Sequence, residues 1–111
     1  MKRTAFKPST KPMRKRSPKR AAYMASQARQ DGLAHMGRVA QLGCLVCGAR
    51  PVEVHHFPDP RDDLRTGPLC PFHHRWEYGP QAYHYSRRNF NELHGTDEEL
   101  LARVNFLLYG D

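Results

Sequence analysis

The sequence predicts a small α+β domain with a metal-stapled ββα core, flanking helices and a disordered basic arm at the N-terminus. Three observations predict this class. Two pairs of Cys and His residues enclose two short strand patterns, helical patterns lie on both sides of them, and all five lysines fall within the first nineteen residues. We therefore place the arm at residues 1–20 and one folded domain at residues 21–111.

The arm is set apart by its charge. Residues 1–20 carry nine basic side chains and no acidic one, whereas the remaining chain has nine arginines against eleven acids. Three prolines and only two sizeable apolar side chains beyond the initiator cannot offset the entropy of ordering, so we expect disorder. A flexible polycation suits phosphate backbones, and the alternatives are a solubilising tail, a nuclear-localisation-like run or a membrane-surface arm. The arm residues expected to bind nucleic acid are Lys15, Arg16, Lys19 and Arg20.

The sequence also bounds the compartment. No apolar segment follows the basic run, and no stretch of the chain is long and apolar enough for a membrane helix. This pattern predicts a soluble intracellular protein with no membrane partner. Three cysteines cannot all pair, and a disulfide framework is not expected inside a cell. Because a folded part of about ninety residues has a modest core, bound metal is the expected additional source of stability.

Two helical patterns precede the strands. Residues 21–30 are alanine-rich, and a second pattern runs from Leu33 to near Gly43, with the break between them expected at Asp31 and Gly32. After the first Cys pair, residues 52–56 alternate as a short strand, prolines and aspartates mark a loop, and residues 66–69 complete a hairpin.

Three helix starts follow the hairpin. Pro71 suits the first position of a helix that carries the second histidine pair and stops at the sequence "YGP". Ser86 is expected to cap a helix that ends near Gly95, and Thr96 with Glu99 forms a capping box for a C-terminal helix. The apolar stripe of that last helix is expected in the core and comprises Leu100, Leu101, Val104, Leu107 and Leu108.

Two knuckles carry a strong metal signal. Cys44 and Cys47 are separated by two residues, and so are Cys70 and His73. Three thiolates and one neutral imidazole match tetrahedral zinc, and a site with all four ligands used is structural. Cysteines that only fill the core would not explain the repeated spacing. We therefore predict that these four residues bind Zn²⁺ and that the ion supplies much of the folding free energy.

Four of the six other histidines lie in or close after the two motifs, namely His55, His56, His74 and His84. A ββα unit can bring a strand-end histidine and a helix histidine to one cation, and His84 can return as a third ligand. Three neutral imidazoles leave coordination positions open, as a catalytic metal requires, and a free histidine beside the metal can deprotonate water. Because adjacent strand residues point to opposite faces, we expect the strand to end at the doublet with both rings toward His74.

The segments "CLVC", "EVHHF" and "PLCPFHHR", in this order, resemble the HNH, or ββα-metal, endonuclease superfamily in its zinc-stapled form. With "HMGRVAQLGCLVCG" and "HGTDEELL" added, most of residues 35–104 resembles the phage recombination enhancement function (Ref) type. The resemblance implies metal-dependent hydrolysis of DNA phosphodiester bonds that leaves 5′-phosphate and 3′-hydroxyl ends. Matched by position, it implies that His55, His74 and His84 hold Mg²⁺ or Mn²⁺ and that His56 is the general base.

The Ref resemblance also implies that the substrate is double- or single-stranded DNA and that a RecA-type filament is a partner. It further implies that the protein comes from a phage or prophage and works in the cytoplasm of a bacterial host. Two other function classes fit the residues. A non-catalytic zinc-ribbon protein would use the stapled hairpin as a nucleic-acid-binding platform, and a recombination accessory factor would dock its tail on a protein or filament. The surplus of histidines around a complete zinc site favours the nuclease.

One position departs from the HNH pattern. The asparagine that orients the base in that pattern is absent from the segment "DDLRTGPLC". Asp63 is the candidate catalytic replacement, because a carboxylate can accept a hydrogen bond from His56 and fix its tautomer. Alternatively, Arg65 occupies the position and contacts phosphate, or Asp63 is an ordinary loop residue.

Further candidates surround the metal motifs. Four arginines are expected to contact phosphate or to be ordinary surface residues, namely Arg65, Arg75, Arg87 and Arg88. Four aromatic side chains are expected in the core rather than stacked on bases, namely Trp76, Tyr78, Tyr83 and Phe90. His35 and His94 fall outside the metal motifs and are expected to be structural or solvated.

Overall fold

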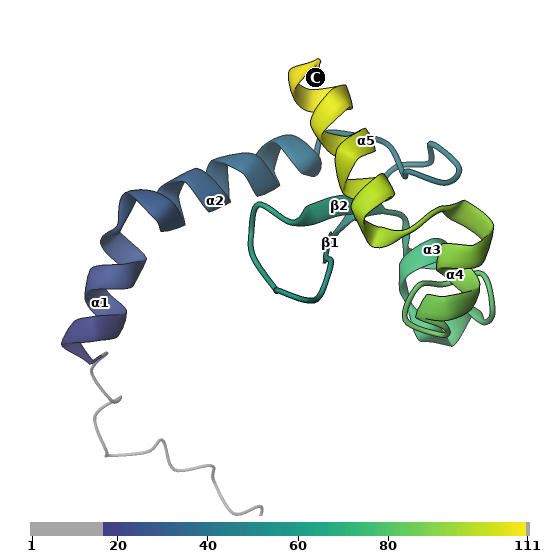
Figure 1. Ribbon diagram of the computed structural model, residues 1–111, viewed down its shortest axis with the longest axis horizontal. Coiled ribbons are helices and arrows are strands. Elements are labelled where there is room, and N and C mark those ends of the chain that lie inside the picture. The colour runs from purple at the N-terminus through teal and green to yellow at the C-terminus, as the bar shows by residue number, and fades with distance from the viewer. Residues whose placement is uncertain (1–16, 111) are drawn as a thin grey trace, which may run out of the picture.

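A β-hairpin lies at the centre of the structure, next to the C-terminal helix (Figure 1). The computed structural model describes residues 17–110. Strand β1 (Glu53–His56) pairs antiparallel with β2 (Thr66–Leu69), and His55 lies opposite Gly67. Both strands agree with the sequence prediction, and β1 ends at the histidine doublet as expected. Every residue of β2 is buried, because three helices contact this strand.

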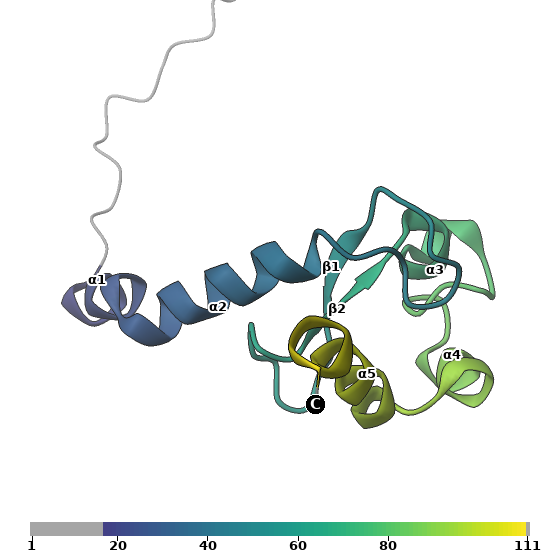
Figure 2. The ribbon, with the colours of Figure 1, turned by 90° about the horizontal axis from the view of Figure 1, so that it is seen from above.

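Two helices precede the hairpin, meet at an angle and extend away from it in both views (Figures 1 and 2). Helix α1 (Pro18–Ala25) ends at Ser26, whose extended backbone interrupts the helix and whose hydroxyl caps α2 (Gln27–Val39) by accepting from the Arg29 amide. The break expected at Asp31 and Gly32 is therefore wrong. Gly32 lies inside α2, because helix continuation costs a glycine only about 1 kcal/mol and a serine cap offers a better boundary.

The start of α1 also lies within the predicted basic arm. Ser17 caps the helix by accepting from the Arg20 amide, and Pro18 occupies a first-turn position that suits proline. Lys19 and Arg20 are thus helical, and the expectation of disorder is wrong for this last part of the arm. The rest of the expected disordered arm, with Lys15 and Arg16, lies outside the described residues.

The helix predicted after the hairpin is divided into two short pieces. Helix α3 (Pro71–His74) ends because Arg75 adopts an extended conformation, and a 3₁₀ helix, η1, follows at Trp76–Tyr78. Gly79 closes this segment with a positive φ of 93°. The division matters for the site, because the two histidines of α3 occupy its last turn.

The last two helices begin as the sequence predicts. Ser86 caps α4 (Arg87–His94), and a reciprocal capping box of Thr96 and Glu99 starts α5 (Asp97–Tyr109). Helix α5 packs on β2 and on the C-terminal end of α2 (Figure 2). In the predicted stripe, Leu100, Leu101 and Val104 are buried, and Leu108 packs at the edge of the core. The prediction that Leu107 lies in the core is wrong, because the residue is 52% exposed near the end of the helix.

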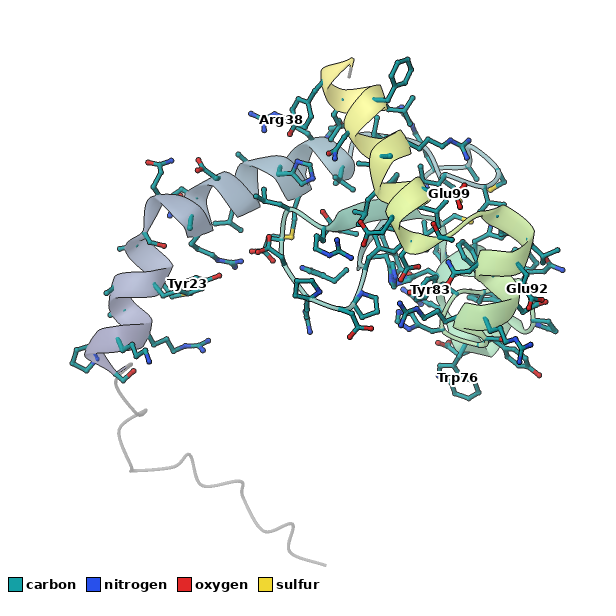
Figure 3. All side chains as sticks on the ribbon, in the orientation of Figure 1. Tyr23, Arg38, Trp76, Tyr83, Glu92 and Glu99 are labelled. Carbon is teal, nitrogen blue, oxygen red and sulfur yellow. The ribbon has the colours of Figure 1, made fainter. Side chains whose placement is uncertain are left out.

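Two of the four aromatic residues expected in the core are exposed. Trp76 is 66% exposed and Tyr78 is 50% exposed, and Figure 3 shows Trp76 directed away from the ribbon. Both belong to η1, which lies at the surface, so their size did not place them in the core. Tyr83 and Phe90 are buried as expected. The described residues therefore form a small α+β structure with five α-helices and one two-stranded sheet.

Across residues 17–110, no helix is both long enough and apolar enough to span a membrane.

The two histidines outside the metal motifs take structural positions. His35 is buried, and its Nδ1 lies 2.7 Å from the Tyr109 hydroxyl, which ties α2 to α5. His94, at the end of α4, lies edge-on to Phe90. Both agree with the structural role expected for them.

Candidate metal centres

The first candidate centre gathers Cys44, Cys47, Cys70 and His73, as the sequence predicts. Cys44 and Cys47 lie on a tight turn closed by a hydrogen bond from the Gly48 amide to the Cys44 carbonyl, 2.8 Å long. Cys70 follows β2 directly and acts as the N-cap residue of α3, so that His73 reaches the same point one helical turn later. One donor atom from each of the four residues lies within 4.8 Å of every other.

The donor distances fit one tetrahedral ion. Zinc bonds of about 2.3 Å to sulfur and about 2.0 Å to nitrogen place tetrahedral sulfur atoms about 3.8 Å apart and sulfur and nitrogen about 3.5 Å apart. Cys47 Sγ lies 3.7 Å from Cys70 Sγ, and His73 Nδ1 lies 3.3 Å from Cys70 Sγ and 3.7 Å from Cys44 Sγ. The sulfur separation is far beyond the ~2.05 Å of a disulfide. The four residues therefore form a cluster that can hold a metal ion such as zinc.

Burial and hydrogen bonds shift the pKa values of three residues of this cluster. Burial raises the pKa of the Cys70 thiol to about 11. Burial also raises the pKa of Cys44, but hydrogen bonds, chiefly from the backbone amides of Cys70, Cys47 and Val46, outweigh it and leave the value below the usual one. The pKa of His73 is lowered by burial and by the charge of His94. Because metal ligands must be deprotonated, cation binding here releases protons and is coupled to folding.

The second candidate centre gathers His55, His74 and His84, also as predicted. His55 comes from β1, and His74 comes from the last turn of α3. The segment between η1 and α4 returns to α3, where the Tyr83 amide donates to the His73 carbonyl over 2.8 Å and the His84 amide donates to the His74 carbonyl over 3.3 Å. This backbone pairing brings His84 beside His74. One ring nitrogen from each of the three histidines lies within 4.8 Å of the others.

Hydrogen bonding at His74 fixes which nitrogen faces the centre. His74 Nδ1–H donates to Glu53 Oε1 over 3.0 Å, which leaves Nε2 with a lone pair. That Nε2 lies 3.1 Å from His84 Nε2. Two lone pairs at this distance repel, so a proton or a cation must lie between the two nitrogens.

The environment of His55 favours a cation over a proton between His74 and His84. Its side chain is only 2% exposed, and its Nε2 is buried without a hydrogen-bond partner among the described residues. A hydrogen bond between His74 and His84 would leave this costly buried nitrogen unexplained, whereas a third coordination bond would satisfy it. The ring of His55 lies 5.1 Å from that of His74 and 5.0 Å from that of His84, centroid to centroid.

The protonation states suit metal binding. Burial, reinforced by His74, His84 and other nearby charges, lowers the pKa of His55 to about 3, so this imidazole is neutral at neutral pH. Burial and His74 also lower the pKa of His84. A hydrogen bond from Arg75, together with one from His74, lowers the pKa of Glu53 to about 2, so this carboxylate stays charged. Neutral imidazole is the form that coordinates a metal ion, and a carboxylate behind it makes the ligand more basic.

His56 lies beside this centre and is held by Asp63. His56 Nε2–H donates to Asp63 Oδ1 over 2.9 Å, and the hydrogen bond from His56, with a further one from Arg29, lowers the pKa of Asp63. The imidazole therefore keeps its basic lone pair on Nδ1. His56 and the three histidines of the second centre line one pocket of about 280 Å³. The full lining comprises Val54, His55, His56, Pro58, Arg61, His74 and His84. The expectation that both doublet rings face His74 holds for His55, whereas His56 turns its Nε2 to Asp63.

Three contributors to this site were missed from the sequence. Glu53 lies two residues before His55 on β1, a spacing that places both side chains on one face of the strand and could have indicated their proximity. Arg61 lines the histidine pocket from the loop between the strands. Arg29 reaches Asp63 from α2, 34 residues earlier in the chain, and no local pattern indicates that contact.

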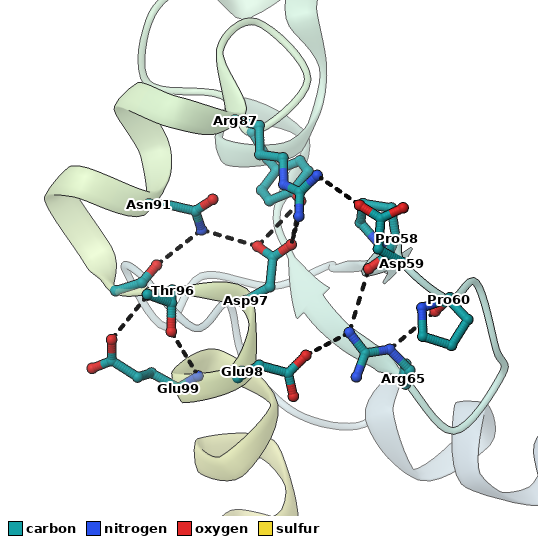
Figure 4. Close-up of polar contacts among 12 residues, drawn as sticks. Pro58, Asp59, Pro60, Arg65, Arg87, Asn91, Thr96, Asp97, Glu98 and Glu99 are labelled. Atoms are coloured by element: carbon teal, nitrogen blue, oxygen red, sulfur yellow. Dashed lines mark hydrogen bonds and ion pairs between the residues drawn. The ribbon is translucent and has the colours of Figure 1, made fainter.

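The four arginines expected to contact phosphate or to be ordinary surface residues each pair with a carboxylate of the chain. Arg65 lies 2.7 Å from Glu98 and donates to the Pro58 and Pro60 carbonyls, while Arg87 lies 2.8 Å from the buried Asp97 (Figure 4). Arg75 forms a bidentate pair with Glu53, in which Nε donates to Oε1 and Nη2 donates to Oε2. Arg88, with a side chain 92% exposed, pairs with Glu92 along α4. The position next to His56 is thus filled by Asp63 rather than by Arg65.

Comparison of this chain with protein-family models, with curated proteins and with solved structures gives no match. The function must therefore be inferred from the chain's own geometry, above all from the histidine triad and the pocket between β1, α3 and the segment that carries His84.

Proposed function

We propose that this protein is a metal-dependent endonuclease of the HNH type, which hydrolyses phosphodiester bonds in DNA. The proposal rests on one observation: the triad of His55, His74 and His84 and the pair of His56 and Asp63 line or border a single pocket. A purely structural metal site needs no open pocket and no oriented base beside it. A site for hydrolysis needs both.

The chain's own residues supply the acid–base chemistry. The Asp63 carboxylate holds the Nε2–H tautomer of His56, so Nδ1 accepts the proton of a water molecule as its oxygen attacks phosphorus. The bond between phosphorus and the 3′ oxygen breaks as the new bond forms, and the departing 3′ oxygen takes a proton from solvent water to become the 3′-hydroxyl. Glu53 orients His74 from behind. A divalent cation held by His55, His74 and His84, Mg²⁺ or Mn²⁺, would supply positive charge to the phosphate and the departing oxygen.

Charge supports DNA as the substrate. The chain has a formal net charge of +7, and its basic excess lies in the N-terminal twenty residues. Lys19 and Arg20 present that charge on the first turn of α1, and Arg61 presents it at the pocket. Such contacts give salt-dependent affinity with little sequence preference. The Ref resemblance adds that a RecA-type filament is the partner and that the enzyme works in phage recombination or DNA processing in a bacterial cytoplasm.

The direct test is plasmid nicking with Mg²⁺ or Mn²⁺. Parent protein and His56→Ala are compared at equal zinc content, which separates loss of the base from loss of the fold. We expect the variant to lose about 10²- to 10⁴-fold in rate. Because imidazole ligands bind first-row transition ions more strongly than Mg²⁺, Mn²⁺ should act at lower concentration. Equal activity of the two proteins would remove His56 from the mechanism.

A non-catalytic zinc-ribbon protein that binds nucleic acid is the second candidate. It is favoured by the completeness of the Cys₃His cluster, which needs no second metal, and by the absence of the HNH asparagine. It predicts one zinc ion per chain, unchanged DNA binding after His55→Ala or His74→Ala, and no cleavage with any divalent ion. Elemental analysis beside the nicking assay separates the two candidates.

A further inference from the structure

Asp63 is held from two sides. Its Oδ1 accepts from His56 over 2.9 Å, and its Oδ2 accepts from the Arg29 guanidinium over 2.7 Å. The side chains of Asp63 and Arg29 are 19% and 25% exposed, so the pair is largely shielded from water. Both oxygens of this carboxylate thus have a defined partner, one in the pocket and one on α2.

Gly32 lies three residues after Arg29, on the same face of α2, and is buried. A Cβ at this position would lie 2.8 Å from Asp63 Cβ and 2.9 Å from Asp63 Oδ2. Real Cβ atoms do not approach other atoms this closely, and the nearest atoms belong to a short side chain that is fixed at its other end. Asp63 can therefore approach α2 only because residue 32 is glycine.

The contact is made at a cost that an ordinary surface ion pair would not require. Glycine is the poorest helix former after proline, yet it stands within α2. In addition, Arg29 Nε is buried without a hydrogen-bond partner among the described residues. A pair that only joined two surface segments would stabilise little and would not need either feature. Both features are explained if the orientation of Asp63 itself is required.

We propose that Arg29 and Gly32 are positioning residues for the reaction: they fix the Asp63 carboxylate, and Asp63 fixes the Nε2–H tautomer of His56. The inference rests on the proposed nuclease function, in which Nδ1 of His56 takes the proton from water. Asp63 thereby takes the place of the asparagine in the HNH pattern, and α2 holds Asp63 in that place. Arg29 contributes a guanidinium that keeps Oδ2 occupied, so that Oδ1 remains turned to His56.

The helix offers a matched pair of substitutions. Gly32→Ala and Gly37→Ala both replace a glycine of α2 and raise helix propensity equally, but a Cβ at Gly37 meets nothing within 4 Å. We expect Gly37→Ala to keep the parental kcat for nicking. Gly32→Ala should lower kcat about 10-fold with KM close to the parental value, because it moves a supporting group and not a substrate contact. Equal kcat in the two variants would overturn the proposal.

A second pair of variants keeps the proposal testable if Gly32→Ala does not fold. Arg29→Ala should lower kcat by a similar factor, and Arg29→Lys should restore part of it, because the ammonium can still reach Oδ2. The spectroscopic readout is the ¹⁵N spectrum of the His56 imidazole in zinc-loaded protein, at a pH where the ring is neutral, with its signals assigned by their loss in His56→Ala. The parent should show the Nε2–H tautomer alone, and Arg29→Ala should show a mixture of both.

This spectrum separates the two hypotheses. A parent that fixes the tautomer through Arg29 but never cleaves DNA would refute the nuclease and leave the positioning role standing. A tautomer unchanged in Arg29→Ala would overturn the positioning role, whatever happens to kcat, because the loss of rate would then have another cause.

Discussion

The two metal-ligand clusters differ in how far they are open to solvent, although they use adjacent residues of one helix. His73 belongs to the first and His74 to the second, because successive residues on a helix are turned by about 100°. In the first cluster, three of the four ligands are no more than 8% exposed, and thiolates predominate. In the second, the histidines are buried, half-buried and exposed in turn, and they open into a pocket.

Under the proposed function, this difference corresponds to a structural role for the first cluster and a catalytic role for the second. A closed set of four ligands leaves no position for substrate and can only stabilise, whereas an open set of three leaves positions for chemistry. Each histidine of α3 has its own partner: His73 packs with the thiolates and His74 with Glu53. Substitutions in the first cluster should therefore change folding, and those in the second should change activity alone.

The largest expected effect tests the closed cluster. Cys70→Ser should abolish the folded state of the isolated chain, because a structural zinc ion contributes about 10–16 kcal/mol in small zinc domains and whole domains are stable by only about 5–15 kcal/mol. The measurement is thermal unfolding by circular dichroism with zinc content by elemental analysis. His74→Ala is the matched control and should keep both the zinc ion and the unfolding transition. A folded, zinc-free Cys70→Ser protein would contradict the structural role of the first cluster.

The next effect tests the base of the open site. In Asp63→Asn, the amide can donate to Nε2 of His56 and so favours the Nδ1–H tautomer, which has no basic nitrogen in the required place. We expect nicking to fall about 10²- to 10⁴-fold, while zinc content stays unchanged. Asp62→Asn, one residue earlier in the same loop, is the control, since the Asp62 carboxylate accepts from the Leu64 amide rather than from a histidine. Similar losses in both variants would point to a damaged loop rather than a lost tautomer.

A smaller effect tests the proposed binding of a divalent cation at the open site. Glu53→Gln removes the charged partner of His74 Nδ1 and should weaken binding of Mn²⁺ about 10- to 100-fold, as is usual for the group behind a metal-bound histidine. Titration of nicking rate against Mn²⁺ concentration measures this shift. Glu77→Gln, on η1, removes a charge nearby without touching a histidine pair and should leave the titration unchanged. An unaltered titration in Glu53→Gln would show that the Glu53 carboxylate does not strengthen metal binding through His74.

Local signals in the sequence predicted local structure well. The Ser86 and Thr96 caps, the two-residue gap between ligands and the end of β1 at the doublet all depend on residues a few positions apart. The helix break at Gly32 was wrong because propensity favours a break there, whereas packing against Asp63 requires glycine within the helix. Trp76 was misplaced because hydrophobic size alone does not show which short segment lies at the surface.

The histidines of both clusters were predictable, and so was the pairing of His56 with Asp63, but two other supporting contacts were not. Glu53 and His74 are 21 residues apart, and Arg29 and Asp63 are 34 apart. Such pairs follow from how the hairpin packs on α2 and α3, which no spacing in one sequence reveals. The ligands of a site are thus encoded by residue type and spacing, whereas the groups that orient them depend on tertiary packing.

The smallest effect asks which face DNA approaches. Arg61 lines the pocket of the open site, whereas Arg103 lies exposed on α5 and provides the control. If DNA reaches the open site, Arg61→Ala should weaken binding a few-fold and lower the slope of log affinity against log salt by about one, the value for a single lost phosphate contact. Arg103→Ala should leave both unchanged. Because Trp76 is the chain's one tryptophan and 66% exposed, its fluorescence can follow the titration. Equal slopes in the two variants would mean that DNA binds no more closely to the open site than to the rest of the surface. The two clusters would then differ in their effect on stability and not in access to DNA.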